Sequence, residues 1–177
     1  MSKVGHISHL EELMFEQGVD GTRIAINFLR DLRNMLAGHT VFPGDFSLKW
    51  DGSPAIFVGR DSQSQFISTK AILTGKHTLY RTIGHIEGAS ILEGLRAKLL
   101  AVFPYLMEVE VKENRMYWGD LLYTPDTLSK MDYEGEPHWC IHPNTVMYII
   151  KVDSDTGRKI ADNPIGIAWH TPLMYMP

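Results

Sequence analysis

The fold is decided around the stretch SLKWDGSPAIF, residues 47–57, where the chain changes from a helical to a strand-like pattern. Short runs rich in apolar and aromatic residues at 45–51, 54–59 and 65–70 are separated by turn residues. Runs this short, punctuated in this way, are typical of an antiparallel meander. We therefore expect three neighbouring strands in this part of the chain.

The chain before this stretch has helical spacing. Residues 9–15 can form a short helix that stops near Gly18, and Asp20 or Thr22 can cap a second helix, with Gly38 just beyond its end. The apolar residues of the second helix recur at the intervals of one helix face: Ala25, Phe28, Leu29, Leu32, Met35 and Leu36. The residues that fall largely on the other face are Arg30, Asp31, Arg33 and Asn34. We expect the apolar stripe to pack on a core.

The remaining chain alternates between strand and helix patterns. We expect a helix at 86–102, strands at 107–112, 115–123, 146–152 and 165–171, a loop at 124–142 and a turn at 153–157. The sum is a single α+β domain over 1–177. Its helical N-terminal segment, 1–40, is followed by a mixed, mostly antiparallel sheet region with one inserted helix, 41–177.

Composition excludes several classes of protein. The chain has 177 residues, of which 44% are apolar and 21% charged, as in ordinary globular domains and unlike disordered chains or coiled coils. A net charge of −4 argues against clamping nucleic acid by bulk positive charge. Cys140 is the single cysteine, so a disulfide framework cannot form within the chain. We expect a soluble cytoplasmic protein without a membrane partner, because no apolar run is long enough to span a bilayer.

Lys49 is the residue with the most distinctive surroundings. On a strand, alternation would place Lys49 and Asp51 on one side and Trp50 on the other, with the lysine partly desolvated. Burial of this kind lowers the pKa of an ammonium group and frees a neutral amine to act as a nucleophile. Gly52 would allow a phosphate or sugar to approach the backbone closely. A plain hairpin, with a solvated lysine and Asp51 at its turn, fits the same residues.

The wider pattern resembles a known family. Lys49-x-Asp51-Gly52 resembles motif I of the covalent nucleotidyltransferases, which include DNA ligases, RNA ligases and mRNA capping enzymes. Segments similar to motifs Ia, III, IIIa and IV follow in the family's order at 67–70, 117–122, 146–150 and 166–170. Over roughly residues 9–171 the chain more closely resembles an uncharacterised family of tailed-phage proteins with a ligase-like nucleotidyltransferase domain. The resemblance implies the cytoplasm of an infected bacterium as its location.

The resemblance implies a ligase-like adenylation domain and its chemistry. Lys49 would attack ATP and become a covalent lysyl-AMP, with Mg²⁺ as the cation and a nucleic-acid 5′-phosphate as acceptor. Asp120 would bind the ribose hydroxyls or the metal, Lys70 would contact phosphate or orient Asp120, and Tyr148 would stack on adenine. The residues implied for the pocket floor are Asp51, Gly52 and Ser53.

The chain also departs from this family. Pro54 stands where ligases usually carry an arginine, and Ile165 stands in place of the motif IV acid. The two lysines of motif V would follow Thr171, but the remaining residues to Pro177 contain no lysine, so we also consider a shortened chain. A second hypothesis is a catalytically reduced phage protein that binds nucleotide, nucleic acid or a host protein through the same cleft.

Three other patterns suggest different sites. Glu110-Val111-Lys112 fits half of a nuclease motif, with Asp45 or Asp51 as the further acid. His138 and His142 could contribute to a zinc site with an acid. A mildly basic stretch could line a groove for phosphates or be a solvated face: Lys70, Lys76, His77, Arg81 and His85.

Overall fold

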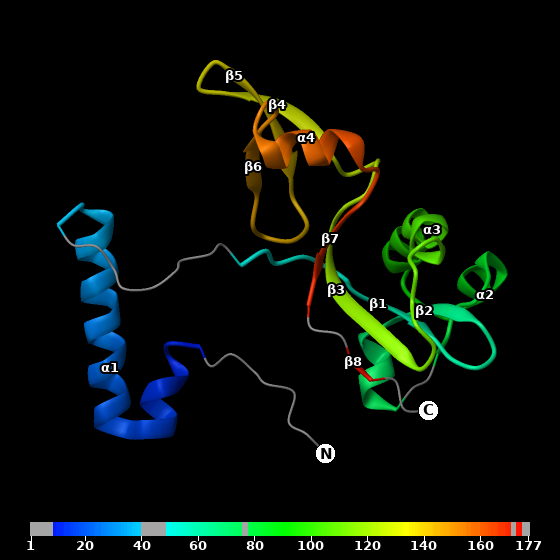
Figure 1. The fold of residues 1–177 in the computed structure, drawn as a ribbon, viewed down its shortest axis with the longest axis horizontal. Helices are drawn as coiled ribbons and strands as arrows, with labels where there is room; N and C mark the ends of the chain where they lie inside the picture. The colour runs from blue at the N-terminus through cyan, green and yellow to red at the C-terminus, as the bar shows by residue number, and fades with distance from the viewer. Residues whose placement is uncertain (1–8, 40–48, 76–77, 171–172, 175–177) are drawn as a thin grey trace. The chain divides into compact units, whose positions relative to one another are not determined.

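The computed structural model describes residues 9–39, 49–75, 78–170 and 173–174 (Figure 1). The chain divides into two compact units, 1–48 and 49–177. The α+β architecture is confirmed, since an N-terminal helical segment precedes antiparallel sheets. Among the described residues, no helix is both long enough and apolar enough to cross a membrane.

The N-terminal unit contains α1, Glu12–Leu36, which is broken at Gly18 by backbone angles of φ 57° and ψ −130°. The two helices expected on either side of Gly18 are therefore confirmed. The predicted cap is wrong, because helical structure resumes at once and both Asp20 and Thr22 lie inside the helix. The Thr22 hydroxyl instead donates to the Gly18 carbonyl at 3.0 Å. Gly38 follows the helix with φ 73°, as expected of a residue just past a helix end.

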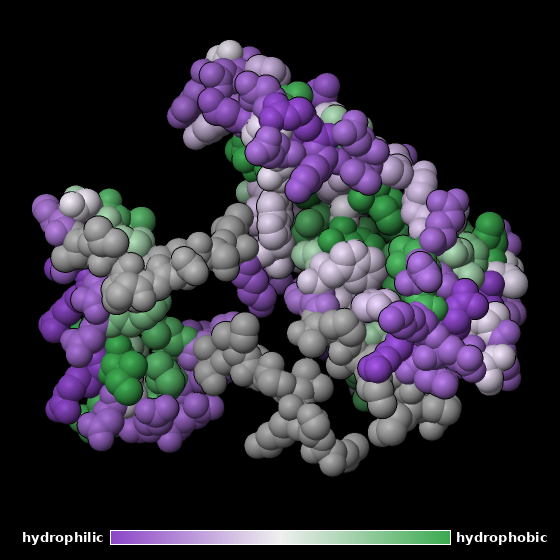
Figure 2. Space-filling view, in the orientation of Figure 1, coloured by the Kyte–Doolittle hydropathy of each residue, from purple (hydrophilic) through white to green (hydrophobic). Residues whose placement is uncertain are grey.

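A close contact joins the two parts of α1. A Cβ added to Gly21 would lie 1.9 Å from the Leu13 carbonyl oxygen, so only glycine fits there. Gly21 is also the single buried residue of α1, while Phe15 and Leu36 are 84% and 75% exposed. Figure 2 shows apolar side chains gathered on one face of this helix with hydrophilic ones along its edge. The described part of this unit therefore has no core of its own.

The second unit is built on a five-stranded antiparallel sheet in the order β2-β1-β3-β7, with β8 also pairing with β3. Its strands are β1 Ala55–Arg60, β2 Gln65–Thr69, β3 Arg115–Tyr123, β7 Gly166–Trp169 and β8 Leu173–Met174. The strands expected at 54–59, 65–70, 115–123 and 165–171 are confirmed. The strand expected at 45–51 is not, because 49–51 lies outside any strand and 45–48 lies outside the described residues.

Two helices cover one face of this sheet, α2 Ile83–Glu87 and α3 Glu93–Met107. The enclosed core there contains Ile56, Val58, Ile67, Ile86, Leu99, Val102, Leu106 and Leu121. Buried Gln65 secures the end of α3, since its Nε2 lies 2.9 Å from the carbonyl oxygens of both Leu106 and Val109. A buried amide so placed satisfies carbonyls that a helix end leaves without intrahelical partners.

The inserted helical region differs from the expectation. The predicted helix at 86–102 is two helices, and α3 continues past Pro104 to Met107. Burial of Phe103 and Leu106 on the core outweighs the hydrogen bond that the proline removes near the helix end. The strand predicted at 107–112 is therefore absent, because its first residue is helical and 108–112 pairs with no neighbouring strand.

A second sheet of three antiparallel strands follows, in the order β4-β5-β6. Its strands are β4 Ser129–Tyr133, β5 Glu136–Ile141 and β6 Tyr148–Lys151, with helix α4 Asp155–Asp162 beside them. The expected loop at 124–142 is thus wrong, since β4 and β5 form a hairpin whose turn has positive φ at Glu134 and Gly135. The expected turn at 153–157 is the start of α4, where Ser154 Oγ accepts from the Gly157 N–H at 3.0 Å.

Candidate functional site

The motif I segment, Lys49–Pro54, runs between the two sheets of the second unit. On one side the Tyr148 hydroxyl of β6 accepts from the Asp51 N–H at 2.7 Å and donates to the Asp51 carbonyl at 3.2 Å. On the other side the Ser53 N–H donates to the Leu121 carbonyl of β3 at 2.9 Å. These backbone contacts fix the segment against both sheets, although it belongs to neither.

Two side chains add to this attachment. Asn144 Nδ2 donates to the Asp51 carboxylate at 3.1 Å, and Lys98 Nζ of α3 donates to the Ser53 carbonyl at 2.9 Å. Sequence reasoning selected neither residue, because each is separated from the segment by more than forty positions. The segment is therefore positioned by α3, β3 and β6 together.

Gly52 is required by packing. A Cβ at this position would lie 2.4 Å from the Leu121 carbonyl oxygen, a distance that side-chain carbons do not tolerate. The sequence suggested close approach of a phosphate or sugar, whereas the backbone that approaches here is that of β3. The glycine is accounted for without a ligand.

Lys49 is exposed and lies outside any strand, so the partial desolvation expected for it is not found. Strand alternation does not apply to this segment. Trp50 is half-buried, and its ring lies 4.8 Å from the Tyr148 ring at an interplanar angle of 43°. Tyr148 is itself 8% exposed. Its ring was expected to stack on adenine, and in the structure it packs on Trp50.

Asp120 lies on the sheet face opposite α3. It pairs in register with Ala55 of β1 and Ala168 of β7, and its side chain is 16% exposed. Its Oδ2 lies 3.1 Å from His170 Nε2, forming a carboxylate–imidazole pair. The His170 ring lies 4.1 Å from the Trp118 ring. Because the rings of Trp118 and fully buried Phe57 are stacked at 5.8 Å, this pair rests on an aromatic support.

The Asp120–His170 pair was not anticipated. The two residues are fifty positions apart, and only the pairing of β3 with β7 brings them together. A signal existed in the order of the segments, since Gly119-Asp120 and Trp169-His170 both lie in segments that resemble family motifs. Without the strand order, nothing in the sequence joins those two segments.

Lys70 follows β2, the edge strand of the same sheet. Thr69 pairs with Ile56, so Lys70 follows at the level of Ala55, two strands from Asp120, or about 10 Å. Lys70 is exposed at the start of the short 3-10 helix η1, Lys70–Thr74. No hydrogen bond or ion pair joins Lys70 to Asp120, both of which the structure describes.

The alternative sites of the sequence gain no support. Glu110 and Lys112 are exposed and belong to no strand, and Asp45, one candidate acid of a nuclease site, lies outside the described residues. Buried His138 places its Nδ1 2.8 Å from the Glu136 carbonyl. In the described parts of the chain, no three His, Cys, Asp or Glu side chains come together as a metal site would need.

The mildly basic stretch gains no support as a phosphate-binding groove either. Lys76 and His77 lie outside the described residues, and Arg81 is paired with Asp61 at 2.5 Å. This guanidinium lowers the pKa of the Asp61 carboxyl to about 2, chiefly through its hydrogen bonds. Arg81 also lies over the Phe66 ring at 5.4 Å. Its charge therefore stabilises the turn between β1 and β2 and is not free to bind phosphate.

Fold and site together define an α+β domain in which a hydrogen-bonded segment joins two antiparallel sheets beside a carboxylate–imidazole pair. The chain belongs to a family of unknown function, DUF6267, whose model matches residues 5–175. No curated protein and no solved structure matches the chain.

Proposed function

We propose that this protein is an adenylyl-transferring domain of the ligase-like nucleotidyltransferase type, with Lys49 as its nucleophile. The observation that carries the proposal is the adjacency of four segments that are distant in sequence. The segments similar to motifs Ia, III and IV lie in or beside β2, β3 and β7 of one sheet, and the motif I segment bonds to β3. A nucleotide site needs such segments to meet at one place.

The proposed reaction uses the free amine of Lys49. Its nitrogen forms a bond to the α-phosphorus of ATP and loses a proton to solvent, while the bond from that phosphorus to the bridging oxygen breaks. The electron pair of the broken bond leaves with pyrophosphate, and AMP remains on the lysine. In the second step an oxygen of the acceptor, a nucleic-acid 5′-phosphate, bonds to the phosphorus, and the lysine nitrogen leaves with the electron pair of the broken bond and takes a proton from solvent. An exposed amine at the end of a fixed segment is accessible to such a substrate.

The described side chains can hold Mg²⁺ only if a bound nucleotide supplies further oxygen ligands. Magnesium in such sites takes one or two carboxylates and completes its shell with phosphate oxygens and water. Asp120 offers one carboxylate on the sheet face, and no all-protein cage of three acidic or imidazole groups forms among the described residues. When bound, the cation would offset the charge of the phosphates. Asp120 would contact the cation or the ribose.

A second function is favoured by the contacts that the same residues already make. Tyr148 is hydrogen-bonded to Asp51 and packs on Trp50, and Asp120 is hydrogen-bonded to His170. Gly52 packs closely on the backbone of β3. Because these residues already have partners within the protein, they fit a catalytically reduced domain, which binds nucleotide, nucleic acid or a host protein without adenylyl transfer. The two functions differ in whether Lys49 becomes covalently modified.

The experiment that separates them is covalent labelling. The protein is incubated with ATP labelled at the α-phosphate and with Mg²⁺, then denatured and separated on a gel. The enzyme predicts label that survives denaturation and is lost in Lys49→Ala. A matched control is Lys159→Ala, which removes another exposed lysine, in α4, and should leave the label unchanged.

The remaining outcomes decide against the enzyme. Label that persists in Lys49→Ala would assign the modification to another residue and overturn the role of Lys49. Absence of label, with ATP binding retained in calorimetry, would favour the reduced domain. Absence of both label and nucleotide binding would remove the nucleotide from the proposal altogether.

A further inference from the structure

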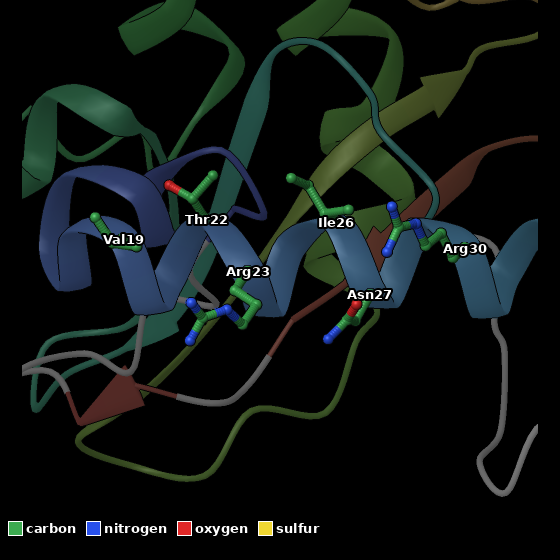
Figure 3. Close-up of a pocket in the computed structure, with 6 residues that line it drawn as sticks. All are labelled: Val19, Thr22, Arg23, Ile26, Asn27 and Arg30. Atoms are coloured by element: carbon green, nitrogen blue, oxygen red, sulfur yellow. The ribbon is translucent and has the colours of Figure 1, made fainter.

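The polar face of α1 carries a stripe of arginine and asparagine. After the break at Gly18 the helix is continuous to Leu36. Arg23, Asn27, Arg30 and Asn34 are spaced by four, three and four residues, which places them on one side of a helix. The stripe spans about 16 Å along the axis at 1.5 Å per residue. Figure 3 shows Arg23, Asn27 and Arg30 along this side of the helix.

A hollow lies along the same side. Its volume is about 340 Å³, and it is lined by Val19, Thr22, Arg23, Ile26, Asn27 and Arg30 (Figure 3). Two guanidinium groups therefore border a shallow space with an apolar residue, Ile26, in its wall. A concave surface of this size accommodates one unit of a larger ligand.

The guanidinium groups here have few partners. Arg23 is 70% exposed and lies 3.4 Å from Asp20, a surface pair of small energy. Arg30 makes no hydrogen bond or ion pair with any residue that the structure describes. Arg33, at the edge of the stripe, holds the Asn34 amide oxygen at 2.9 Å. Three arginines against two aspartates, Asp20 and Asp31, give 19–36 a net charge of +1, although the chain is acidic overall.

The face of α1 opposite this stripe is apolar. Ala25, Leu29, Leu32 and Leu36 follow the helix period about half a turn away from Arg23 and Arg30. Arg23 and Arg30 are exposed, and on the apolar face Leu29 and Leu36 are 53% and 75% exposed. A membrane surface that took up the apolar face would hold the arginines near its head groups, so binding to anionic vesicles is a separate outcome of the test.

We propose that this stripe binds the phosphate backbone of a nucleic acid. Guanidinium groups bind phosphate through two parallel hydrogen bonds, and asparagine amides between them can donate to phosphate or to a base edge. Arg23 and Arg30 are seven residues apart, about two helix turns or 10 Å along the axis, and a polyanion with repeated phosphates can reach both where a single small anion cannot. The proposal is independent of chemistry at Lys49.

Fluorescence anisotropy of the full chain with a labelled single-stranded DNA of twenty nucleotides tests the proposal over a range of salt concentrations. Binding should weaken as salt rises, and Arg23→Gln/Arg30→Gln should weaken it at least about tenfold and reduce the salt slope by about 1 per arginine. Arg23→Lys/Arg30→Lys should retain most of the salt slope, because it keeps the charge. A matched control is Arg115→Gln, which removes an exposed arginine of β3 and should have no effect.

Equal affinity and equal salt slope in the parent and in Arg23→Gln/Arg30→Gln would overturn the proposal. The proposal would also be overturned if the parent protein bound anionic phospholipid vesicles but not DNA, and the same variant lost the binding to vesicles. Far-ultraviolet circular dichroism of the variant should match the parent, since neither arginine is buried. The labelling experiment and the DNA-binding experiment use different variants and different readouts, so failure of adenylyl transfer and failure of DNA binding are separate results.

Discussion

On the sheet face that α3 covers, aliphatic side chains are enclosed: Ile56, Ile67 and Leu121 are each 2% exposed or less. On the opposite face Trp118 and Asp120 of β3 lie beside His170, and Asp120 and His170 remain 16% and 25% exposed. The same strands supply both faces, because neighbouring residues in a strand point in opposite directions. One face is scaffold, and the other retains groups capable of chemistry.

The largest expected effect breaks the scaffold face. Leu99→Ala should lower the free energy of unfolding by about 2–5 kcal/mol, because it leaves a cavity at a fully buried site. Urea unfolding followed by circular dichroism measures the loss. Leu92→Ala is the matched control, since this leucine at the start of α3 is 82% exposed and its loss should cost less than about 0.5 kcal/mol. Equal effects of the two would contradict the enclosed core.

The next effect tests the contact between the motif I segment and β3. Gly52→Ala should destabilise the protein by about 1–3 kcal/mol, because its new methyl group meets the Leu121 carbonyl. Gly94→Ala, in α3 with open space around it, should instead stabilise by about 0.5–1 kcal/mol. Thermal unfolding of the two variants compares them directly. A neutral Gly52→Ala would show that the segment does not lie against β3.

A smaller effect depends on pH. The pKa of Asp61 is lowered from 3.8 to about 2 by Arg81, so the folded state binds its proton less readily than the unfolded state. The resulting stability, at most about 2 kcal/mol, is present above pH 4 and is lost as the pH falls from about 4 to 2. Urea unfolding across this window should show the loss, and Asp61→Asn should remove this contribution. An identical pH dependence in Asp61→Asn would exclude the pair as its source.

The smallest effect concerns the polar face. His170→Phe keeps a ring against Trp118 but removes the hydrogen bond to Asp120, and it should cost about 1 kcal/mol. His170→Gln can restore a donor and should cost less. A double-mutant cycle with Asp120→Asn should give a coupling free energy of about 0.5–1.5 kcal/mol. Additive effects would indicate that the two side chains do not interact in solution.

Local signals predicted the elements whose own residues decide them. The β1, β2 and β3 strands follow from their short apolar runs, and the break at Gly18 follows from a glycine between two helical patterns. The β4–β5 hairpin was missed because Pro125, Gly135 and Pro137 were interpreted as loop residues. Glu134-Gly135 nevertheless forms a tight turn with positive φ, which two-residue hairpins favour.

The candidate site was predictable only in part. Lys49, Asp51, Gly52 and Asp120 were selected by motif spacing, but their partners were not. Asn144, Lys98 and His170 come from distant parts of the chain, and no local pattern marks a side chain whose role depends on a remote neighbour. The expected burial of Lys49 failed because its segment is not a strand.

The sequence by itself determined the β1, β2 and β3 strands, the helix break at Gly18 and the helix face that carries Arg23 and Arg30, since these depend on residues close together in the chain. Only the tertiary structure decided which strands are neighbours, and with that the meeting of Asp120 with His170 and of Gly52 with β3. Strand order depends on packing between remote segments, where many pairings satisfy the same local pattern and the complete core selects one.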